Sequence, residues 1–283
     1  MKKIIVVLIL LSISLNSFAA KVEFIASGNL FTCLGTKSLV KCFGFSVDGI
    51  IQSIPFNNLK KITAGSYHVC ALDDDGMWCW GYNLSGQIDN PNDLKNVKDI
   101  SARGDNTCAI DEEGVKCWGD NHYGQTNIPA NLNNPKLVIA GAHTCAVDED
   151  GIKCWGNNYY GQTNVPTEIK NPLQIALGHS HTCSLENQKV KCWGDNKYGQ
   201  TDVPENLKNP RQISSKNLHT CVIDDEGVKC WGFNRDGQTN TPSLLENPKQ
   251  ISAGWLHSCA LVDKGAKCWG YNSYGQTDVP LEL

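Results

Sequence analysis

Residues 251–280 read ISAGWLHSCALVDKGAKCWGYNSYGQTDVP, and variants of this phrase recur along the chain. Each copy holds two cysteines separated by eight residues, and successive pairs begin 37 or 38 residues apart. The seven pairs are Cys33 and Cys42, Cys70 and Cys79, Cys108 and Cys117, Cys145 and Cys154, Cys183 and Cys192, Cys221 and Cys230, and Cys259 and Cys268. A fixed period of this length is typical of repeat architectures, in which each unit packs on its neighbours.

The segments around each cysteine pair are predicted to be β-strands. Residues 107–110 and 115–118 are short, rich in β-forming side chains and bounded by Gly, Asp or Asn. No stretch shows the 3.6-residue apolar period of a helix. Asp-x-x-Gly turns such as residues 73–76 join the two strands, with the glycine in a left-handed conformation. This register places Cys70 opposite Cys79.

Opposed cysteines on antiparallel strands predict disulfides. Directly opposed residues lie about 4.5–5.5 Å apart at Cα, which a disulfide can bridge. We therefore expect one cross-strand disulfide in each repeat. The alternative is zinc, but zinc sites favour more closely spaced cysteines and four converging ligands. We predict no metal and no cofactor.

Seven short β-repeats favour a closed ring over an open stack, because closure removes exposed strand edges. We predict an all-β protein, a seven-bladed β-propeller spanning residues 20–283. Its repeats are residues 21–57, 58–95, 96–133, 134–170, 171–208, 209–246 and 247–283. We expect residues 22–26 to complete the last blade beside the chain end at Leu283.

Residues 1–19 have the composition of a signal peptide. Lys2 and Lys3 precede an apolar run over residues 4–15, and small residues favour cleavage after Ala19. Fourteen cysteines agree with export, because cytosolic thiols stay reduced. We predict a periplasmic or secreted protein, exported through a cleaved signal peptide.

Charge and hydropathy exclude some partners. The net charge is −4, and no run rich in Lys or Arg offers the basic surface of a nucleic-acid-binding protein. No second hydrophobic segment follows residue 20, so we expect no membrane insertion. We expect a monomer.

Repeated residues are predicted to be structural. His68, His143, His181, His219 and His257 share one position, which is Asn106 in the third repeat and Phe31 in the first. A metal ring would not accept these two residues, so hydrogen bonding or packing within a blade is favoured. The Trp of each Cys-Trp-Gly is expected to pack between blades. Sugar stacking on these tryptophans is the alternative.

The repeats resemble the regulator-of-chromosome-condensation repeat family, whose units read A-G-x-x-H-T/S and then W-G-x-N-x-x-G-Q. Residues 193–204, WGDNKYGQTDVP, also resemble the repeats of a secreted member, the type II β-lactamase inhibitory protein. The resemblance covers all seven units and implies a seven-bladed propeller. The paired cysteines depart from the family pattern.

Two positions vary in every repeat, one before the His-Thr-Cys phrase and one between Trp-Gly and Gly-Gln. In the secreted inhibitor, loops at these positions share one face and hold the target with aromatic and acidic residues. The resemblance implies a protein-binding role for Tyr67, Asp120, Tyr123, Tyr160, Asp195, Tyr198, Trp255 and Tyr274. Tyrosine and tryptophan are also favoured at protein interfaces.

We therefore predict an exported binding protein that docks on another protein, with enzyme inhibition as one form of this function. We predict no catalytic residues. One alternative is a propeller lectin that binds glycans, which would present the same side chains in every blade. Another is a polysaccharide-lyase-like enzyme, for which His122, His179, Arg103 and Arg235 are the irregular candidates.

Overall fold

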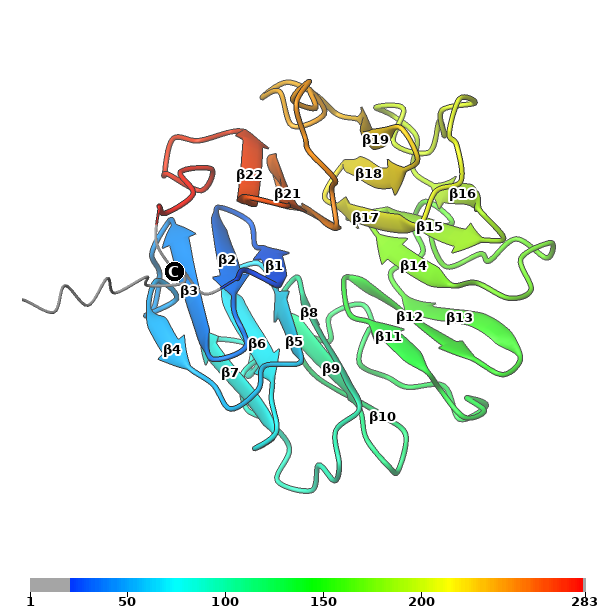
Figure 1. Ribbon diagram of the computed structural model, residues 1–283. Coiled ribbons are helices and arrows are strands. Elements are labelled where there is room, and N and C mark those ends of the chain that lie inside the picture. Colours follow the sequence, from blue (N-terminus) through cyan, green and yellow to red (C-terminus); the bar gives the residue numbers. More distant parts are fainter. Residues whose placement is uncertain (1–20, 282–283) are drawn as a thin grey trace, which may run out of the picture.

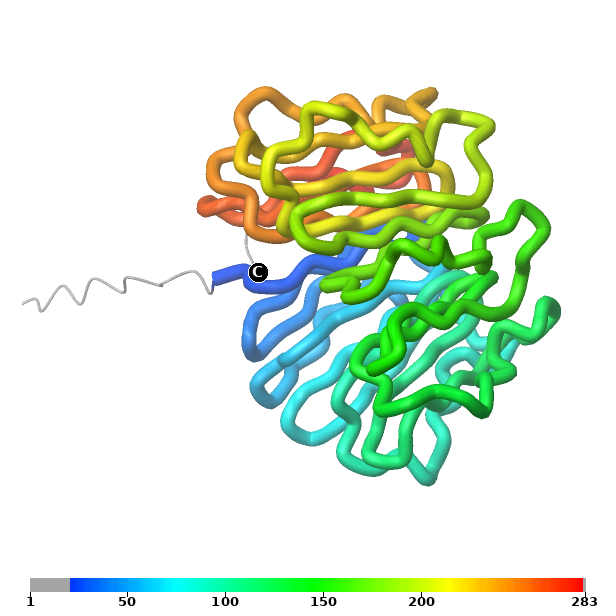
Figure 2. The backbone as a smooth tube through the Cα atoms, turned by 90° about the vertical axis from the view of Figure 1, so that its right-hand side faces the viewer, coloured from blue at the N-terminus to red at the C-terminus, as the bar shows by residue number. Residues whose placement is uncertain are grey.

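The computed structural model describes residues 21–281, which form 22 strands in seven antiparallel sheets. The sheets surround a central axis in chain order, so the first and last are neighbours (Figure 1). Viewed from the side, they follow one another around the ring (Figure 2). The predicted all-β, seven-bladed propeller is confirmed, and we number the blades in chain order. The predicted signal peptide lies outside the described residues.

Each blade contributes an inner, a middle and an outer strand, consecutive in sequence. The inner strands are β1 Phe24–Ser27, β5 Lys61–Ala64, β8 Asp99–Arg103, β11 Leu137–Ile139, β14 Gln174–Leu177, β17 Gln212–Lys216 and β20 Gln250–Ala253. The middle strands are β2 Phe31–Gly35, β6 His68–Leu72, β9 Asn106–Ile110, β12 His143–Asp148, β15 His181–Glu186, β18 His219–Asp224 and β21 His257–Val262. The outer strands are β3 Leu39–Gly44, β7 Met77–Gly81, β10 Val115–Gly119, β13 Gly151–Gly156, β16 Lys189–Gly194, β19 Gly227–Gly232 and β22 Gly265–Gly270. Among the described residues, the first blade alone has a fourth strand, β4 Ser53–Pro55.

The hairpin between the middle and outer strands follows the predicted register. In the second blade, Asp73 Oδ1 accepts hydrogen bonds from the backbone N–H groups of Asp75 and Gly76. Gly76 has φ +127°, which only glycine adopts without strain. Cys70 therefore lies opposite Cys79, as predicted.

All seven predicted disulfides are formed, one in each blade. In chain order they join Cys33 to Cys42, Cys70 to Cys79, Cys108 to Cys117, Cys145 to Cys154, Cys183 to Cys192, Cys221 to Cys230 and Cys259 to Cys268.

The geometry of these disulfides is tighter than predicted. The paired Cα atoms are 4.0–4.1 Å apart, whereas directly opposed strand residues are expected to lie about 4.5 Å apart or more. Every cysteine of the described chain is paired. Seven disulfides favour an oxidising compartment. Within residues 21–281, no helix has the length and apolar character needed to span a bilayer.

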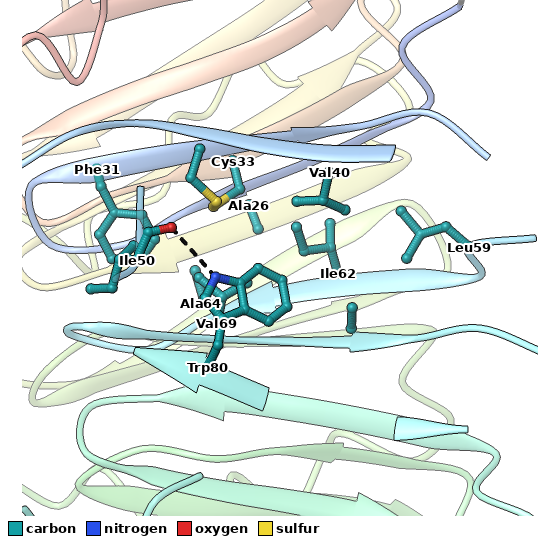
Figure 3. Close-up of a cluster of buried hydrophobic side chains, with 12 residues drawn as sticks. Ala26, Phe31, Cys33, Val40, Ile50, Leu59, Ile62, Ala64, Val69 and Trp80 are labelled. Atoms are coloured by element: carbon teal, nitrogen blue, oxygen red, sulfur yellow. Dashed lines mark hydrogen bonds between the residues drawn. A yellow bond between two sulfur atoms is a disulfide. The ribbon is translucent and has the colours of Figure 1, made fainter. Parts of the chain in front are cut away.

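The hydrophobic core is divided into seven layers, and each layer lies between two neighbouring blades. Figure 3 shows the layer between the first two blades, where Phe31, Ile50, Val69 and Trp80 meet. The repeated tryptophans pack in these layers as predicted, and Trp80 donates its indole N–H to the carbonyl of Ile50. No blade has a core of its own, so each depends on both neighbours.

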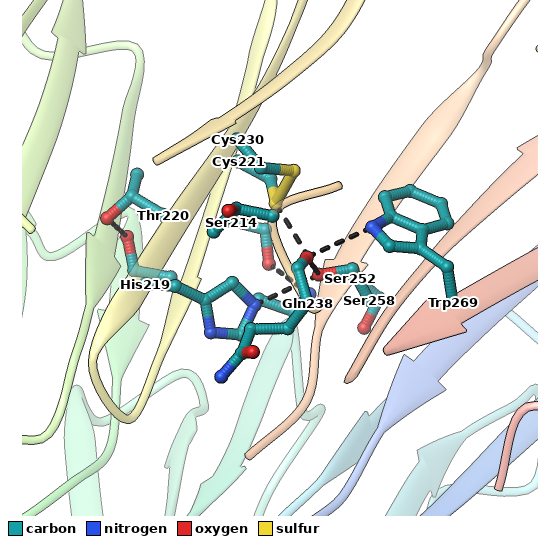
Figure 4. Close-up of a disulfide and its surroundings, with 12 residues drawn as sticks. Ser214, His219, Thr220, Cys221, Cys230, Gln238, Ser252, Ser258 and Trp269 are labelled. Atoms are coloured by element: carbon teal, nitrogen blue, oxygen red, sulfur yellow. Dashed lines mark hydrogen bonds between the residues drawn. A yellow bond between two sulfur atoms is a disulfide. The ribbon is translucent and has the colours of Figure 1, made fainter. Parts of the chain in front are cut away.

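A buried hydrogen bond also joins successive blades. Nε2 of the repeated histidine is hydrogen-bonded to the Thr or Ser hydroxyl of the next blade, at 2.8–2.9 Å. Figure 4 shows the bond from His219 to Ser258, beside the Cys221–Cys230 disulfide. The histidines were predicted to act within a blade, and this detail is wrong because the bond runs between blades.

Where the first blade lacks the histidine, its partner has changed as well. The first blade has Phe31 at the histidine position, and the second blade has Val69 at the hydroxyl position. Both are fully buried in the same apolar layer. An apolar pair thus replaces a polar pair, and no hydroxyl is left without a partner.

The hydroxyl fixes the protonation state of the histidine. In four of the five pairs the hydroxyl lies 2.8–2.9 Å from the backbone carbonyl of a Gly-Gln glutamine and donates its single proton there. In these four pairs histidine Nε2 must therefore carry a hydrogen and donate it to the hydroxyl, which leaves Nδ1 as an unprotonated acceptor. Each Nδ1 is buried without a donor. Burial lowers the pKa of all five histidines from 6.5 to about 3.

The ring closes without exchange of a strand, so the prediction that residues 22–26 complete the last blade is wrong. Strand β1 is the inner strand of the first blade and pairs with β2. Side chains of the last blade bond to it instead: Gln250 Oε1 accepts from Ile25 N, and Ser252 Oγ accepts from Ser27 N. The junction between last and first blades thus resembles the other junctions. Leu283, the expected neighbour of this strand, lies outside the described residues.

Intact mass tests the disulfides. Without reductant, the mass should lie about 14 Da below that of the fully reduced chain, one hydrogen lost per cysteine. The double variant Cys183→Ala with Cys192→Ala should reduce the free energy of unfolding by about 2–3 kcal/mol, because it opens a loop of about ten residues. Urea titration measures this change. Equal masses before and after reduction would contradict the pairing.

The buried histidines make stability depend on pH. Folded imidazoles stay neutral, whereas those of the unfolded chain bind protons below pH 6.5. The free energy of unfolding should therefore fall between pH 6.5 and 5, by up to about 1.4 kcal/mol per pH unit for each histidine. His143→Asn, which copies Asn106 of the third blade, should make this slope shallower in urea titrations. The exposed-loop variant His122→Asn is the control, and an unchanged slope in His143→Asn contradicts the assignment.

Candidate functional site

The two variable positions of each repeat lie side by side. In every blade one backbone hydrogen bond joins them, with an N–H···O distance between N and O of 2.8–3.0 Å. The donor is the residue after the Trp-Gly pair (Phe43-Gly44 in the first blade), and the acceptor is the carbonyl just before the histidine position. The second blade joins Tyr82 to Tyr67 in this way, and the third joins Asp120 to Asp105. We call the surface formed by these fourteen segments the loop face.

The loops of this face are held rigidly by repeated residues. In the third blade, buried Gln125 accepts from Tyr123 N through Oε1 and donates to Asp120 through Nε2. Asn121 Oδ1 accepts from Thr126 N across the same loop. The repeated residues therefore fix the backbone, and the non-repeating side chains project from it.

The aromatic residues predicted for binding lie on this face. Tyr123, Tyr160, Tyr198, Tyr274 and Trp255 are between 38% and 52% exposed. Tyr67 is half-buried between Phe45 and Tyr82, with ring centroids 6.2 and 6.4 Å away. The structure therefore makes the predicted tyrosines and tryptophan available to a ligand.

Asp120 and Asp195 already have partners inside their own loops. Asp120 accepts from His122 N at 3.2 Å and from Gln125 Nε2 at 2.9 Å. Asp195 makes the same two bonds, to Lys197 N and Gln200 Nε2. Both carboxylates therefore stabilise loop geometry, whatever else they contact.

The sequence prediction missed aromatic residues that connect the others. Tyr271, Tyr274, Phe45, Tyr67 and Tyr82 form a continuous row of ring contacts, with centroids 4.9–6.4 Å apart. The row crosses the seventh, first and second blades. Phe45 was missed because the first repeat lacks the Trp-Gly phrase that marks this loop elsewhere. Tyr159 and Phe233 also contact predicted residues, Tyr160 and Tyr198.

A pocket of about 460 Å³ opens on the loop face at the central axis. Every blade contributes to its lining, through Asn29, Ser66, Arg103 to Asn106, Gly141, Ala142, Gly178, His179, Lys216, Asn217 and Trp255. Asp120, Tyr123 and Gln125 add residues from a neighbouring loop. We call it the axial pocket.

Burial shifts the ionisable groups of the axial pocket. It lowers the pKa of Lys216 well below its ordinary value and that of Arg103 to about 9. It raises the pKa of Asp105, against an opposing hydrogen bond from Ser66. Burial and then the charge of Arg103 lower the pKa of His179. The pocket thus holds acidic and basic groups, with Lys216 buried at its wall and His179 exposed at its mouth.

Of the residues considered for an enzyme, the structure brings Arg103 and His179 together in the axial pocket. His122 and Arg235 lie outside its lining. Within residues 21–281, no group of three or more His, Cys, Asp or Glu side chains is arranged to hold a metal. The repeated histidines are each committed to a blade junction instead.

A larger hollow of about 1110 Å³ lies at the opposite end of the inner strands. Residues of the first, second, sixth and seventh blades line it, including Lys21, Lys60, Lys249 and Lys264. Lys60 and Lys249 are paired with Asp74 and Asp263. Its lining mixes charged and apolar side chains, and it lies away from the variable segments.

Comparison with solved structures agrees with this architecture. The ectodomain of the receptor kinase CR4 from Physcomitrella patens has a TM-score of 0.75 and 23% identity, covering 88% of this chain and 73% of that one. The ectodomain of ACR4 from Arabidopsis thaliana has a TM-score of 0.72 and 21% identity, covering 92% and 98%. Yeast RCC1 (Prp20), solved with Kap60, has a TM-score of 0.73 and 16% identity, covering 89% and 81%. These likenesses show the fold.

Among curated proteins, no sequence matches the chain. The model of the regulator of chromosome condensation (RCC1) repeat matches six segments, residues 59–87, 97–125, 141–162, 173–200, 211–238 and 249–276. These segments make up more than half of the chain and coincide with the second to seventh blades. The chain therefore belongs to the regulator of chromosome condensation repeat family, as its repeats indicated.

Proposed function

We propose that this protein is an exported binding protein that docks its loop face on another protein. The seven disulfides support export, because they are stable in an oxidising compartment. Yeast RCC1 is bound to Kap60 in its structure, so a propeller of this fold is compatible with a protein partner. The role requires no catalytic residue in this chain.

The exposed aromatic side chains on rigid loops carry the proposal. Tyrosine and tryptophan provide large contact areas at protein interfaces and lose little side-chain entropy on binding. Loops fixed by buried glutamines, such as Gln125 and Gln162, need little ordering when a partner arrives. The row of ring contacts extends this surface across three blades.

The glycan-binding alternative has weaker support. A lectin with equivalent sites would expose the same side chains in every blade, but the repeated tryptophans Trp155, Trp193, Trp231 and Trp269 are buried. Their indole N–H groups donate to backbone carbonyls of the preceding blade. Four of the exposed tyrosines, Tyr123, Tyr160, Tyr198 and Tyr274, do share the position before Gly-Gln, but Ser85 and Asp236 replace the tyrosine in the second and sixth blades. The other exposed side chains of the loop face differ from blade to blade. An irregular surface suits a single irregular partner, such as a folded protein.

Affinity capture tests the loop face. The double variant Tyr160→Ala with Trp255→Ala should weaken binding of the captured protein at least tenfold, because two exposed aromatic contacts are lost. The control, Leu173→Ala with Leu244→Ala, removes two exposed apolar side chains outside the loop face and should bind as the unmodified protein does. Equal capture by all three proteins would overturn the proposal.

Enzyme inhibition is the finer form of this proposal. β-Lactamase is one candidate target, suggested by the resemblance to the secreted inhibitor. If the captured partner is an enzyme, titration with the unmodified protein should lower its catalytic rate. The loop-face variant should need at least a tenfold higher concentration to give the same loss of rate. If the enzyme keeps its full catalytic rate when it is saturated with this protein, the protein binds the enzyme but does not inhibit it.

A further inference from the structure

Two blades depart from the repeat at the wall of the axial pocket. The glycine of the Ala-Gly-x-x-His phrase is replaced by Arg103 in the third blade and by Lys216 in the sixth. Both residues end their inner strands in an additional pair, with Asn106 and His219 respectively. The replacements therefore place two basic side chains where five blades have no side chain.

Lys216 is saturated by the protein. Its ammonium group donates to the carbonyls of Ser27, Ala64 and Gly65, at 2.8, 3.0 and 3.1 Å. These carbonyls belong to the first two blades, so the side chain of the sixth blade reaches across the axis. An ammonium has three donors, and all three are used, which favours the charged form against the effect of burial. Lys216 therefore adds positive potential to the pocket but has no donor left for a ligand.

Arg103 has an unused donor. Its Nη2 is buried and has no hydrogen-bond partner among the described residues. Its pKa of about 9 keeps the guanidinium charged at neutral pH. A buried charged donor without an acceptor is costly, and an anionic ligand would relieve that cost.

The charged groups around Arg103 favour one kind of anionic ligand over another. Asp105 and Asp120 line the same pocket and offset the two cations, so a doubly charged phosphate would meet repulsion. A carboxylate carries one charge, and its planar pair of oxygens matches the guanidinium fork. Tyr123 and Trp255 also line the pocket and offer apolar surface to the carbon skeleton behind the carboxylate.

We propose that the axial pocket binds a carboxylate group on Arg103, with Lys216 providing supporting positive charge. This chemistry has two sources, an acidic residue of the docked protein or a free organic acid. The first source rests on the proposed function and deepens it, whereas the second does not.

Titration with the α-amide of N-acetylglutamate, a probe that carries one carboxylate, tests the pocket directly. The Arg103 Nε–H and Trp255 indole N–H signals should shift saturably in nitrogen–proton correlation spectra of the folded protein. Arg103→Gln should weaken binding at least tenfold, and Arg103→Lys should weaken it less because the charge remains. Arg235→Gln, which removes an arginine outside the pocket lining, should bind as the unmodified protein does.

Three outcomes would overturn the proposal. These are no saturable shift, unchanged affinity in Arg103→Gln, and inorganic phosphate binding as tightly as the monocarboxylate probe. Melting temperature confirms folding of each variant. Arg103→Gly, which restores the glycine of five other blades, provides a second variant if Arg103→Gln unfolds.

Affinity capture separates the two sources. If the carboxylate belongs to the docked protein, Arg103→Gln should weaken capture together with binding of the monocarboxylate probe. If only binding of the monocarboxylate probe is lost, the ligand is a free organic acid and the pocket assignment stands. Tyr160→Ala changes the loop face outside the pocket lining, so its effect on capture reports on the proposed function separately.

Discussion

The structure depends on a buried hydroxyl at most of its blade junctions. At four junctions, a Thr or Ser accepts a hydrogen bond from the histidine of one blade and donates to the backbone of a glutamine. Each blade has too little apolar surface for a core, so its stability comes from its neighbours. This pair aligns neighbouring sheets while the apolar layer supplies most of the burial. The pair Phe31 and Val69 shows that an apolar pair can take the place of the polar pair at one junction.

The repeated polar residues form hydrogen bonds within these junctions and within the loops. Few of their donors and acceptors are therefore free to bind a ligand. The histidines bond the next blade, the repeated tryptophans other than Trp118 bond backbone carbonyls, and the glutamines hold the loops. The disulfides lock the hairpins that carry these residues, as the bond between Cys145 and Cys154 does in the fourth blade. Variation is therefore tolerated on the loop face, where side chains point away from a backbone that the repeats keep constant.

The axial pocket exists only because seven different blades meet around one axis. Arg103 and Lys216 lie 113 residues apart in sequence, and each looks like an isolated exception to a glycine position. In the ring they share one pocket with Asp105 and His179. A polar, partly desolvated space of this kind strengthens electrostatic interactions with whatever enters it.

The sequence by itself determined the number of blades, the strand register and every disulfide, because these follow from local spacing within one repeat. It also located the variable loops and most of their exposed aromatic residues. Only the tertiary structure decided how the ring closes, that the histidines bond the next blade, and that Phe45 joins a row of rings across three blades. These features depend on contacts between repeats, which local spacing does not specify. The shared pocket of Arg103 and Lys216 also depends on contacts between repeats, because closure of the ring brings their blades to a common axis.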